Sequence, residues 1–63
     1  MTGLYVLTES LEYYSSKLDE ESFVPEGTII EATGRHSAKA GDEFIVNGEP
    51  IWITDAEEII EEV

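Results

Sequence analysis

The chain has 63 residues, and its 15 acidic residues outnumber its 3 basic residues to give a formal net charge of -12. A chain of this length forms one domain, residues 1–63, and the absence of cysteine excludes disulfides and thiolate metal sites as supports for its small core. The acidity excludes direct binding to nucleic acid or to anionic membrane surfaces, because both are polyanions.

The composition and patterning favour a folded, cytoplasmic protein. Hydrophobic residues make up 41% of the chain, which is too many for a typical disordered segment. No run approaches the roughly 18 apolar residues that span a membrane. The segment Met1–Leu4 has neither the basic region nor the apolar run of a signal peptide.

The N-terminal half alternates β-forming and polar segments. Leu4–Thr8 is rich in β-formers and predicts a strand. Leu11–Tyr14 either continues this strand past a bulge near Ser10 or forms a second short strand. Ser15–Ser22 is polar, and we expect a loop or a single turn there.

Proline and glycine mark the predicted turns and loops in the middle of the chain. Phe23–Gly27 predicts a turn in which Pro25 presets φ at the first central position and Gly27 accepts a positive φ. Thr28–Thr33 predicts the next strand, and residues Gly34–Gly41 predict a loop bounded by glycines.

Asn47-Gly48 is the strongest local signal in the sequence. It separates two β-rich runs, Asp42–Val46 and Glu49–Thr54, and both central residues of a type I′ hairpin turn need positive φ. A two-residue loop places Val46 opposite Glu49, Phe44 opposite Ile51 and Asp42 opposite Ile53. Strand side chains alternate between faces. The predicted core face therefore carries Phe44, Val46, Ile51 and Ile53, and the opposite face carries Ile45, Pro50 and Trp52.

The C-terminus changes to a helical period. Its apolar residues recur at i, i+3, i+4 and i+7, as Ala56, Ile59, Ile60 and Val63. Thr54 with Glu57 has the spacing of a capping box. We expect a short α-helix docked by this apolar stripe.

These elements predict a mainly β fold: a small twisted barrel of four to five strands with a short C-terminal α-helix. The order of segments resembles SH3 domains: a first strand, a long polar loop, Phe23–Ile30, a further strand and then the Phe44–Ile53 hairpin. The resemblance implies an SH3-like barrel, although the aromatic groove by which SH3 domains bind peptides has no counterpart that can be mapped onto these residues.

The sequence offers no catalytic or cofactor site. His36 is the only histidine, and its nearness in sequence to Ser37 and Asp42 is not the geometry of a triad. The acidic runs Asp19–Glu21 and Asp42–Glu43 lack the alternating ligands of a calcium loop. We therefore expect a protein that is not an enzyme and that uses neither cofactor nor metal.

The acidic residues are the main functional signal. A net charge of magnitude about 2–8 keeps a small domain soluble, and this chain exceeds that range. A simple alternative is a solvated surface without further role. The functional interpretation is a surface that imitates DNA and binds a basic protein. Its first candidate contacts are Glu57, Glu58, Glu61 and Glu62, on the predicted helix face opposite the apolar stripe; the next are Asp19, Glu20 and Glu21.

In size, acidity and lack of cysteine the chain resembles small bacteriophage proteins that occupy the DNA-binding surfaces of host proteins. The resemblance rests on charge and shape, so it assigns no residue. It implies an inhibitor acting in the host cytoplasm on a basic, nucleic-acid-binding target. An antitoxin or regulator that plugs an enzyme's active site would share the same acidity.

A second hypothesis is a structural or assembly module. Trp52, Ile45 and Pro50 form an apolar hairpin face that needs a second layer or a partner. Arg35 and Lys39 lie in an acid-free stretch from Ala32 to Gly41, and this basic island is complementary to the acidic face of a second copy. Both features are consistent with a homodimer or with docking onto a larger complex, and chance clustering is the simpler account of the island.

Overall fold

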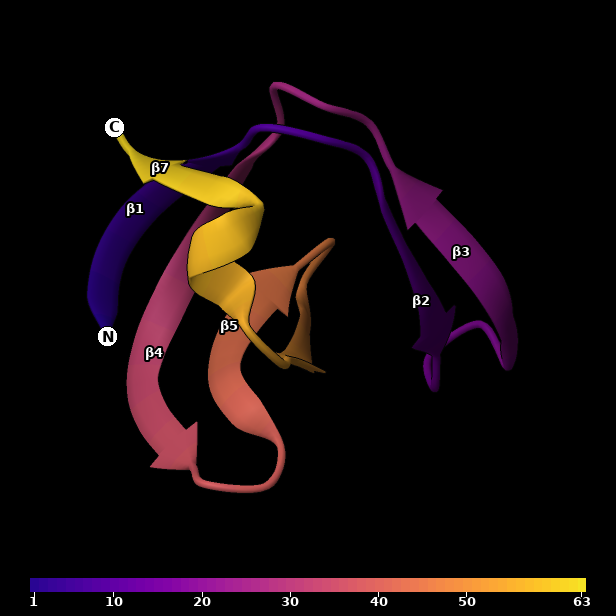
Figure 1. The fold of residues 1–63 in the computed structure, drawn as a ribbon. Helices are drawn as coiled ribbons and strands as arrows, with labels where there is room; N and C mark the ends of the chain where they lie inside the picture. Colours follow the sequence, from indigo (N-terminus) through magenta and orange to yellow (C-terminus); the bar gives the residue numbers. More distant parts are fainter.

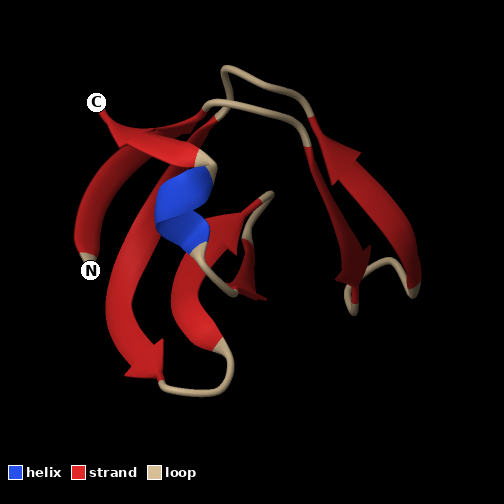
Figure 2. Cartoon of the chain, in the orientation of Figure 1, coloured by secondary structure: helices blue, strands red, loops and turns tan.

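A five-stranded antiparallel sheet forms the body of the computed structural model, which describes residues 1–63 (Figures 1 and 2). Its strand order is β6-β5-β4-β1-β7, and a separate two-stranded sheet pairs β2 with β3. The elements are β1 (Thr2–Leu7), β2 (Leu11–Ser15), β3 (Glu20–Val24), β4 (Ile29–Ser37), β5 (Gly41–Val46), β6 (Glu49–Ile53), the 3-10 turn η1 (Ala56–Glu58) and β7 (Ile60–Glu62).

The mainly β prediction is confirmed, but the strands do not close into a barrel. No backbone ladder joins the β2–β3 hairpin to the larger sheet, and the strands β6 and β7 leave two free edges. In Figure 1 the hairpin stands beside the curved sheet, and the two loops that connect it run across the top of the molecule.

The polar segment 15–22 contains the predicted turn, but its two ends belong to strands. β2 is a strand of its own rather than a continuation of β1, and it pairs with β3, which begins at Glu20. Only residues 16–19 form the turn, with Asp19 at φ 55°. The hairpin buries one face alone, so Ser15 and Ser22 can face inward while acidic side chains line the exterior. This polar composition concealed the strand.

The turn before β4 is shifted by one residue from its predicted position. The Thr28 amide donates to the Pro25 carbonyl at 3.3 Å, so Glu26 and Gly27 are the central residues. Gly27 has a φ of 91°, which the second central position of a type II turn requires. Pro25 therefore precedes the central pair rather than opening it.

The predicted loop 34–41 belongs largely to strand. β4 continues to Ser37, and only residues 38–40 form a turn. The pairing of β4 with β5 shifts between Ala32 and His36, so extra residues on β4 are accommodated in a bulge. Gly34, at φ 93°, lies inside this bulge and allows the strand to continue.

The Asn47-Gly48 hairpin is confirmed in register and in turn conformation. Both residues have positive φ, 51° and 80°. The cross-strand partners are those expected from a two-residue loop, including Phe44 with Ile51 and Val46 with Glu49. Phe44, Val46 and Ile53 are buried on the inner face.

The predicted C-terminal α-helix is wrong. Ala56–Glu58 form one 3-10 turn, and the chain then extends as β7 along β1. Thr54 does not cap a helix, because its hydroxyl donates to the Ala40 carbonyl at 3.2 Å. The segment is short, and two glutamates near its end oppose the helix dipole. The free edge of β1 offers backbone partners instead, and the β-branched residues Ile59 and Ile60 suit an extended conformation.

The core lies between the inner face of the large sheet, the β2–β3 hairpin and η1. The rings of Tyr5 and Phe44 meet edge to face with centroids 6.2 Å apart. η1 lies inside the curve of the sheet in Figure 2, and its Ala56 is fully buried. The buried apolar residues are Leu7, Tyr13, Val24, Ile30, Ala32, Phe44, Val46, Ile53, Ala56 and Ile60.

Gly41→Ala should be far more destabilising than Gly27→Ala. Both glycines have φ near 90°, so both substitutions strain the backbone by about 1–2 kcal/mol. A Cβ at Gly41 would also overlap the Ile53 carbonyl, whereas a Cβ at Gly27 meets open space. The overlap should add about 1–3 kcal/mol to the loss of unfolding free energy, measured by urea denaturation. Equal losses in the two variants would show that Gly41 on β5 does not lie in close contact with the Ile53 carbonyl on β6.

Candidate functional site

The acidic C-terminal segment (Asp55, Glu57, Glu58, Glu61 and Glu62) is fully exposed but does not form one helix face. Glu57 and Glu58 lie in η1, whereas Glu61 and Glu62 lie on β7. Glu61 pairs with Val6 and Glu62 with Tyr5, so these two side chains leave opposite faces of the sheet. The structure therefore spreads the predicted group around the end of the sheet rather than along a single stripe.

The acidic hairpin turn (Asp19, Glu20 and Glu21) forms a second exposed cluster. The Tyr14 hydroxyl donates a hydrogen bond to the Asp19 carboxylate. This bond, followed in weight by desolvation and by the negative charge of Glu21, raises the pKa of Tyr14. Figure 1 shows that this turn and β7 lie at opposite ends of the molecule, so the two predicted acidic groups do not merge.

The carboxylates divide into an exposed set and an internal set. Asp42, Glu43 and Glu49 are the internal ones, and each is bonded within the chain. The other 12 of the 15 are exposed (15 less these 3). The exposed carboxylates are Glu9, Glu12, Asp19, Glu20, Glu21, Glu26, Glu31, Asp55, Glu57, Glu58, Glu61 and Glu62.

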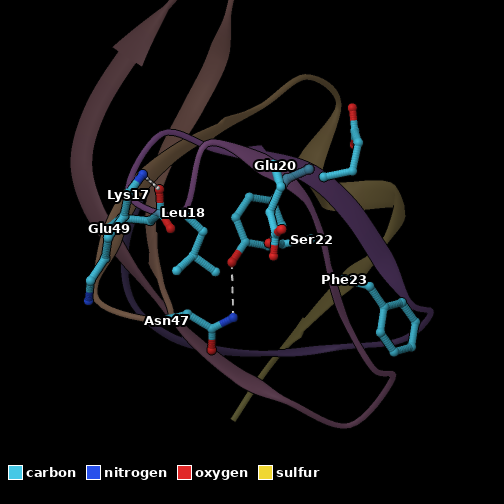
Figure 3. Close-up of a pocket in the computed structure, with 9 residues that line it drawn as sticks. Lys17, Leu18, Glu20, Ser22, Phe23, Asn47 and Glu49 are labelled. Carbon is cyan, nitrogen blue, oxygen red and sulfur yellow. Dashed lines mark hydrogen bonds between the residues drawn. The ribbon is translucent and has the colours of Figure 1, made fainter.

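Glu49 joins the tips of the two hairpins. Its carboxylate accepts a hydrogen bond from the Ser15 hydroxyl at 2.5 Å and one from the Lys17 amide at 3.5 Å. Close by, the Asn47 side-chain amide donates to the Tyr13 hydroxyl at 2.9 Å (Figure 3). These contacts connect the β2–β3 hairpin to the β5–β6 turn. The predicted register of the hairpin places Glu49 opposite Val46 on the core face. That pairing was the one signal in the sequence for the burial of Glu49.

A pocket of about 430 Å³ opens beside these contacts. It contains the exposed apolar side chain of Leu18 and the carboxylates of Glu20 and Glu21, whereas Phe23 lies at its far margin in Figure 3. The lining residues are Tyr13, Lys17, Leu18, Glu20, Glu21, Ser22, Phe23, Asn47 and Glu49.

Glu43 holds Arg35, one of the two cations of the basic island. Its carboxylate accepts a hydrogen bond from the Thr33 hydroxyl at 2.7 Å and lies 3.6 Å from the Arg35 guanidinium. That guanidinium also lies over the Trp52 ring, 5.9 Å from its centroid. The positive charge of Arg35 is thus compensated within the chain. Lys39, by contrast, is exposed and forms no ion pair.

Asp42 is half-buried, and its carboxylate contacts two basic groups at the surface. Its carboxylate lies 3.1 Å from His36 Nδ1 and 3.4 Å from the N-terminal amine. Burial alone would raise the pKa of Asp42, but the hydrogen bonds and positive charges of His36 and the N-terminus outweigh it and lower the pKa. Ser37 takes no part, because its hydroxyl accepts hydrogen bonds from the amides of the next turn.

The residues predicted for self-association lie on the outer face of the large sheet. Ile45 pairs with Pro50, and Trp52 pairs with Glu43, all on the side away from the core. Trp52 is 39% exposed, so it contributes to the surface rather than to a second core layer. Arg35 reaches the same face through its contact with Trp52, whereas Lys39 lies in the β4–β5 turn.

Two further features bear on the class of site. No group of three or more histidine, aspartate or glutamate side chains converges on a position that would hold a metal ion. The structure contains no helix with the length and hydrophobicity needed to cross a bilayer.

Asp42→Asn should lower stability at neutral pH, and the loss should shrink in acid. Because folding lowers the pKa of Asp42, its contribution is present above the unfolded-state value of about 3.9 and is lost as the pH falls through the folded-state value. The measurement is urea denaturation of wild type and variant at pH 7 and pH 2.5.

The control for this titration is Glu12→Gln, which removes an exposed carboxylate that has no ion pair. Relief of charge repulsion should leave that variant at least as stable as wild type at pH 7. An Asp42→Asn deficit of the same size at both pH values would mean that the carboxylate charge contributes nothing.

Comparison with known proteins gives this chain no family: no family model, curated protein or solved structure matches it.

Proposed function

We propose that this protein is a binding protein without catalytic activity, whose acidic surface occupies a basic, nucleic-acid-binding surface of another protein. The observation that carries the proposal is the exposure of 12 carboxylates on a 63-residue chain. Such a target acts in the cytoplasm, which would be the host cytoplasm if the chain is encoded by a phage.

The exposed charge is almost uncompensated. The cations of Arg35 and the N-terminus lie against the internal carboxylates Glu43 and Asp42, and His36 also contacts Asp42. Only Lys17 and Lys39 remain as unpaired basic side chains. A field of one sign steers a basic partner toward the protein and makes association fast and sensitive to salt.

The amount of charge is comparable to that of DNA of the same length. The longest extent of the chain is 28 Å. Duplex DNA of that length carries about 16 phosphate charges, at one per 1.7 Å of axis. The 12 exposed carboxylates approach that number, and β7 and the β2–β3 turn, which each carry some of them, lie at opposite ends of the molecule (Figure 1).

The fold supports this proposal because it holds the exposed carboxylates on ordered backbone. We infer an SH3-like arrangement, supported by the strand order β6-β5-β4-β1-β7 and by the β2–β3 hairpin inserted between β1 and β4, although the sheets do not close. Glu61 and Glu62 are held on paired backbone, and Asp19 closes a tight turn.

Charge reversal at Glu57, Glu58, Glu61 and Glu62 should abolish inhibition of DNA binding. The measurement is displacement of a fluorescent duplex from a panel of basic DNA-binding proteins, followed by anisotropy. Reversal of Asp19, Glu20 and Glu21 should weaken inhibition by about tenfold, because each lost charge pair contributes to affinity.

The matched control reverses Glu9, Glu12 and Glu26, which changes the net charge by the same amount as the triple variant at the hairpin turn. It should retain inhibition within about threefold, because long-range charge acts mainly on the association rate. Full inhibition by the quadruple C-terminal variant would overturn this account, and equal losses in both triple variants would show that only total charge matters.

A second candidate function is a small assembly module that pairs with its own copy or docks onto a larger complex. The observation that favours it is the outer-face position of Ile45, Pro50 and Trp52, with a large aromatic ring exposed. Trp is enriched among residues that dominate the energetics of interfaces.

Trp52→Ala separates this candidate from the first. If the chain assembles through this face, sedimentation velocity should show a species heavier than the 7.0 kDa monomer, and the substitution should dissociate it. The quadruple glutamate reversal should leave that species intact. A wild-type monomer at all concentrations would exclude pairing with its own copy.

A further inference from the structure

The outer face of the large sheet carries apolar side chains beyond the hairpin, in two groups that lie on either side of Glu31. Leu4 and Val6 on β1, Ile29 on β4, and Ile45 and Trp52 on the β5–β6 hairpin all project from the side opposite the core, and Val63 follows β7 beside Leu4. Leu4 is 53% exposed, Ile29 50%, and Val63 73%. Isolated apolar residues are ordinary on a protein surface, but groups of them on one face indicate a contact surface.

An unpaired carboxylate lies between these two apolar groups. Glu31 on β4 is paired with Leu4 on one side and with Ile45 on the other, so its side chain projects between two apolar neighbours. Glu31 is exposed and forms no ion pair. The one cation on this face, Arg35, is already held by Glu43 and the Trp52 ring.

This placement argues against a second copy as the occupant. A two-fold interface is formed by the same patch from both chains, so burying this face would bury the Glu31 carboxylate of each chain. Each would lose hydration without gaining a cation, which is strongly unfavourable. The two chains would also bring together net charges of -12 each.

We propose that the outer face binds an apolar segment of another protein that carries a lysine or arginine, and that this cation pairs with Glu31. The apolar neighbours Leu4 and Ile45 would exclude water around the pair, and Trp52 would cover the end of the segment. The proposal rests on the second candidate function with a partner other than this chain. Of the acidic C-terminal segment, only Glu61, which pairs with Val6, borders this face, and the variants of the test leave that segment unchanged.

The test uses the position of Trp52, the single tryptophan of the chain. Its fluorescence reports directly on occupation of the outer face. The probe is a synthetic 14-residue amphipathic peptide of leucine and lysine. Two further peptides of the same length replace its lysines with glutamate or its leucines with serine. The leucine–lysine peptide should shift the emission to the blue with saturation, and neither of the other peptides should do so.

Two pairs of variants of the full chain then locate the contact. Glu31→Lys should weaken binding of the leucine–lysine peptide by about tenfold, because the desolvated charge pair is lost. Glu12→Lys makes the same change in net charge away from the outer face, and it should weaken binding less than threefold. Leu4→Thr should weaken binding by about fivefold through lost apolar burial, and Phe23→Thr, at an exposed position on the separate hairpin, should leave it unchanged. Circular dichroism establishes that each variant is folded.

Three outcomes would overturn the proposal. Equal weakening by Glu31→Lys and Glu12→Lys would show attraction to total charge alone. Binding of the serine–lysine peptide with the same affinity would show that the apolar surface takes no part. A blue-shifted Trp52 in a chain that sediments as a dimer without peptide would show that a second copy covers the face. Each of these results leaves the DNA-displacement prediction for the C-terminal glutamates untouched.

Discussion

The fold depends on the contact between two sheets that share no backbone ladder. The β2–β3 hairpin is tied to the large sheet by buried side chains, and its tip is held by the carboxylate of Glu49 through Ser15 and the Lys17 amide. A buried carboxylate is costly unless its oxygens are satisfied, and here both accept hydrogen bonds. Because the hairpin covers one side of the core, the burial of Tyr13 and Val24 relies on this contact.

The same chemistry divides the acidic residues into two populations. Three carboxylates are bonded within the chain and organise it: Glu49 joins the hairpins, Glu43 fixes Arg35 on the outer face, and Asp42 holds His36. The remaining carboxylates face water and supply the external field. Because Glu43 takes up the charge of Arg35, Lys39 is the only unpaired cation of the basic island, and the exterior is more uniformly negative than the sequence order indicates.

One local signal in the sequence was reliable because the chemistry of its turn leaves few alternatives, whereas the Pro25–Gly27 turn was predicted one residue out of place. Asn47-Gly48 specified the hairpin, its register and its core face, because few backbone conformations suit that pair. Helical periodicity failed after Thr54, since one apolar stripe of eight residues also fits a 3-10 turn followed by a strand. The free edge of β1 decided between them, and a partner strand that is distant in sequence cannot be inferred from local spacing.

The candidate surfaces were predicted in part. The exposure of the acidic groups followed from composition, but their separation to opposite ends depends on the topology of β7 and the β2–β3 hairpin. The apolar side of the β5–β6 hairpin followed from its register. Its extension to Leu4 and Ile29, with Glu31 between apolar neighbours, required the pairing of β1, β4 and β5.

The two free edges of the large sheet have a bearing on aggregation. An exposed strand edge is a template on which further strands can add, and a small β protein with an apolar outer face is open to that risk. On β6, Pro50 lacks the amide that an added strand would need. On β7, only three residues are available, and two of them are glutamates. Charged side chains on a short edge strand disfavour the addition of further strands, and this effect of Glu61 and Glu62 does not depend on a partner.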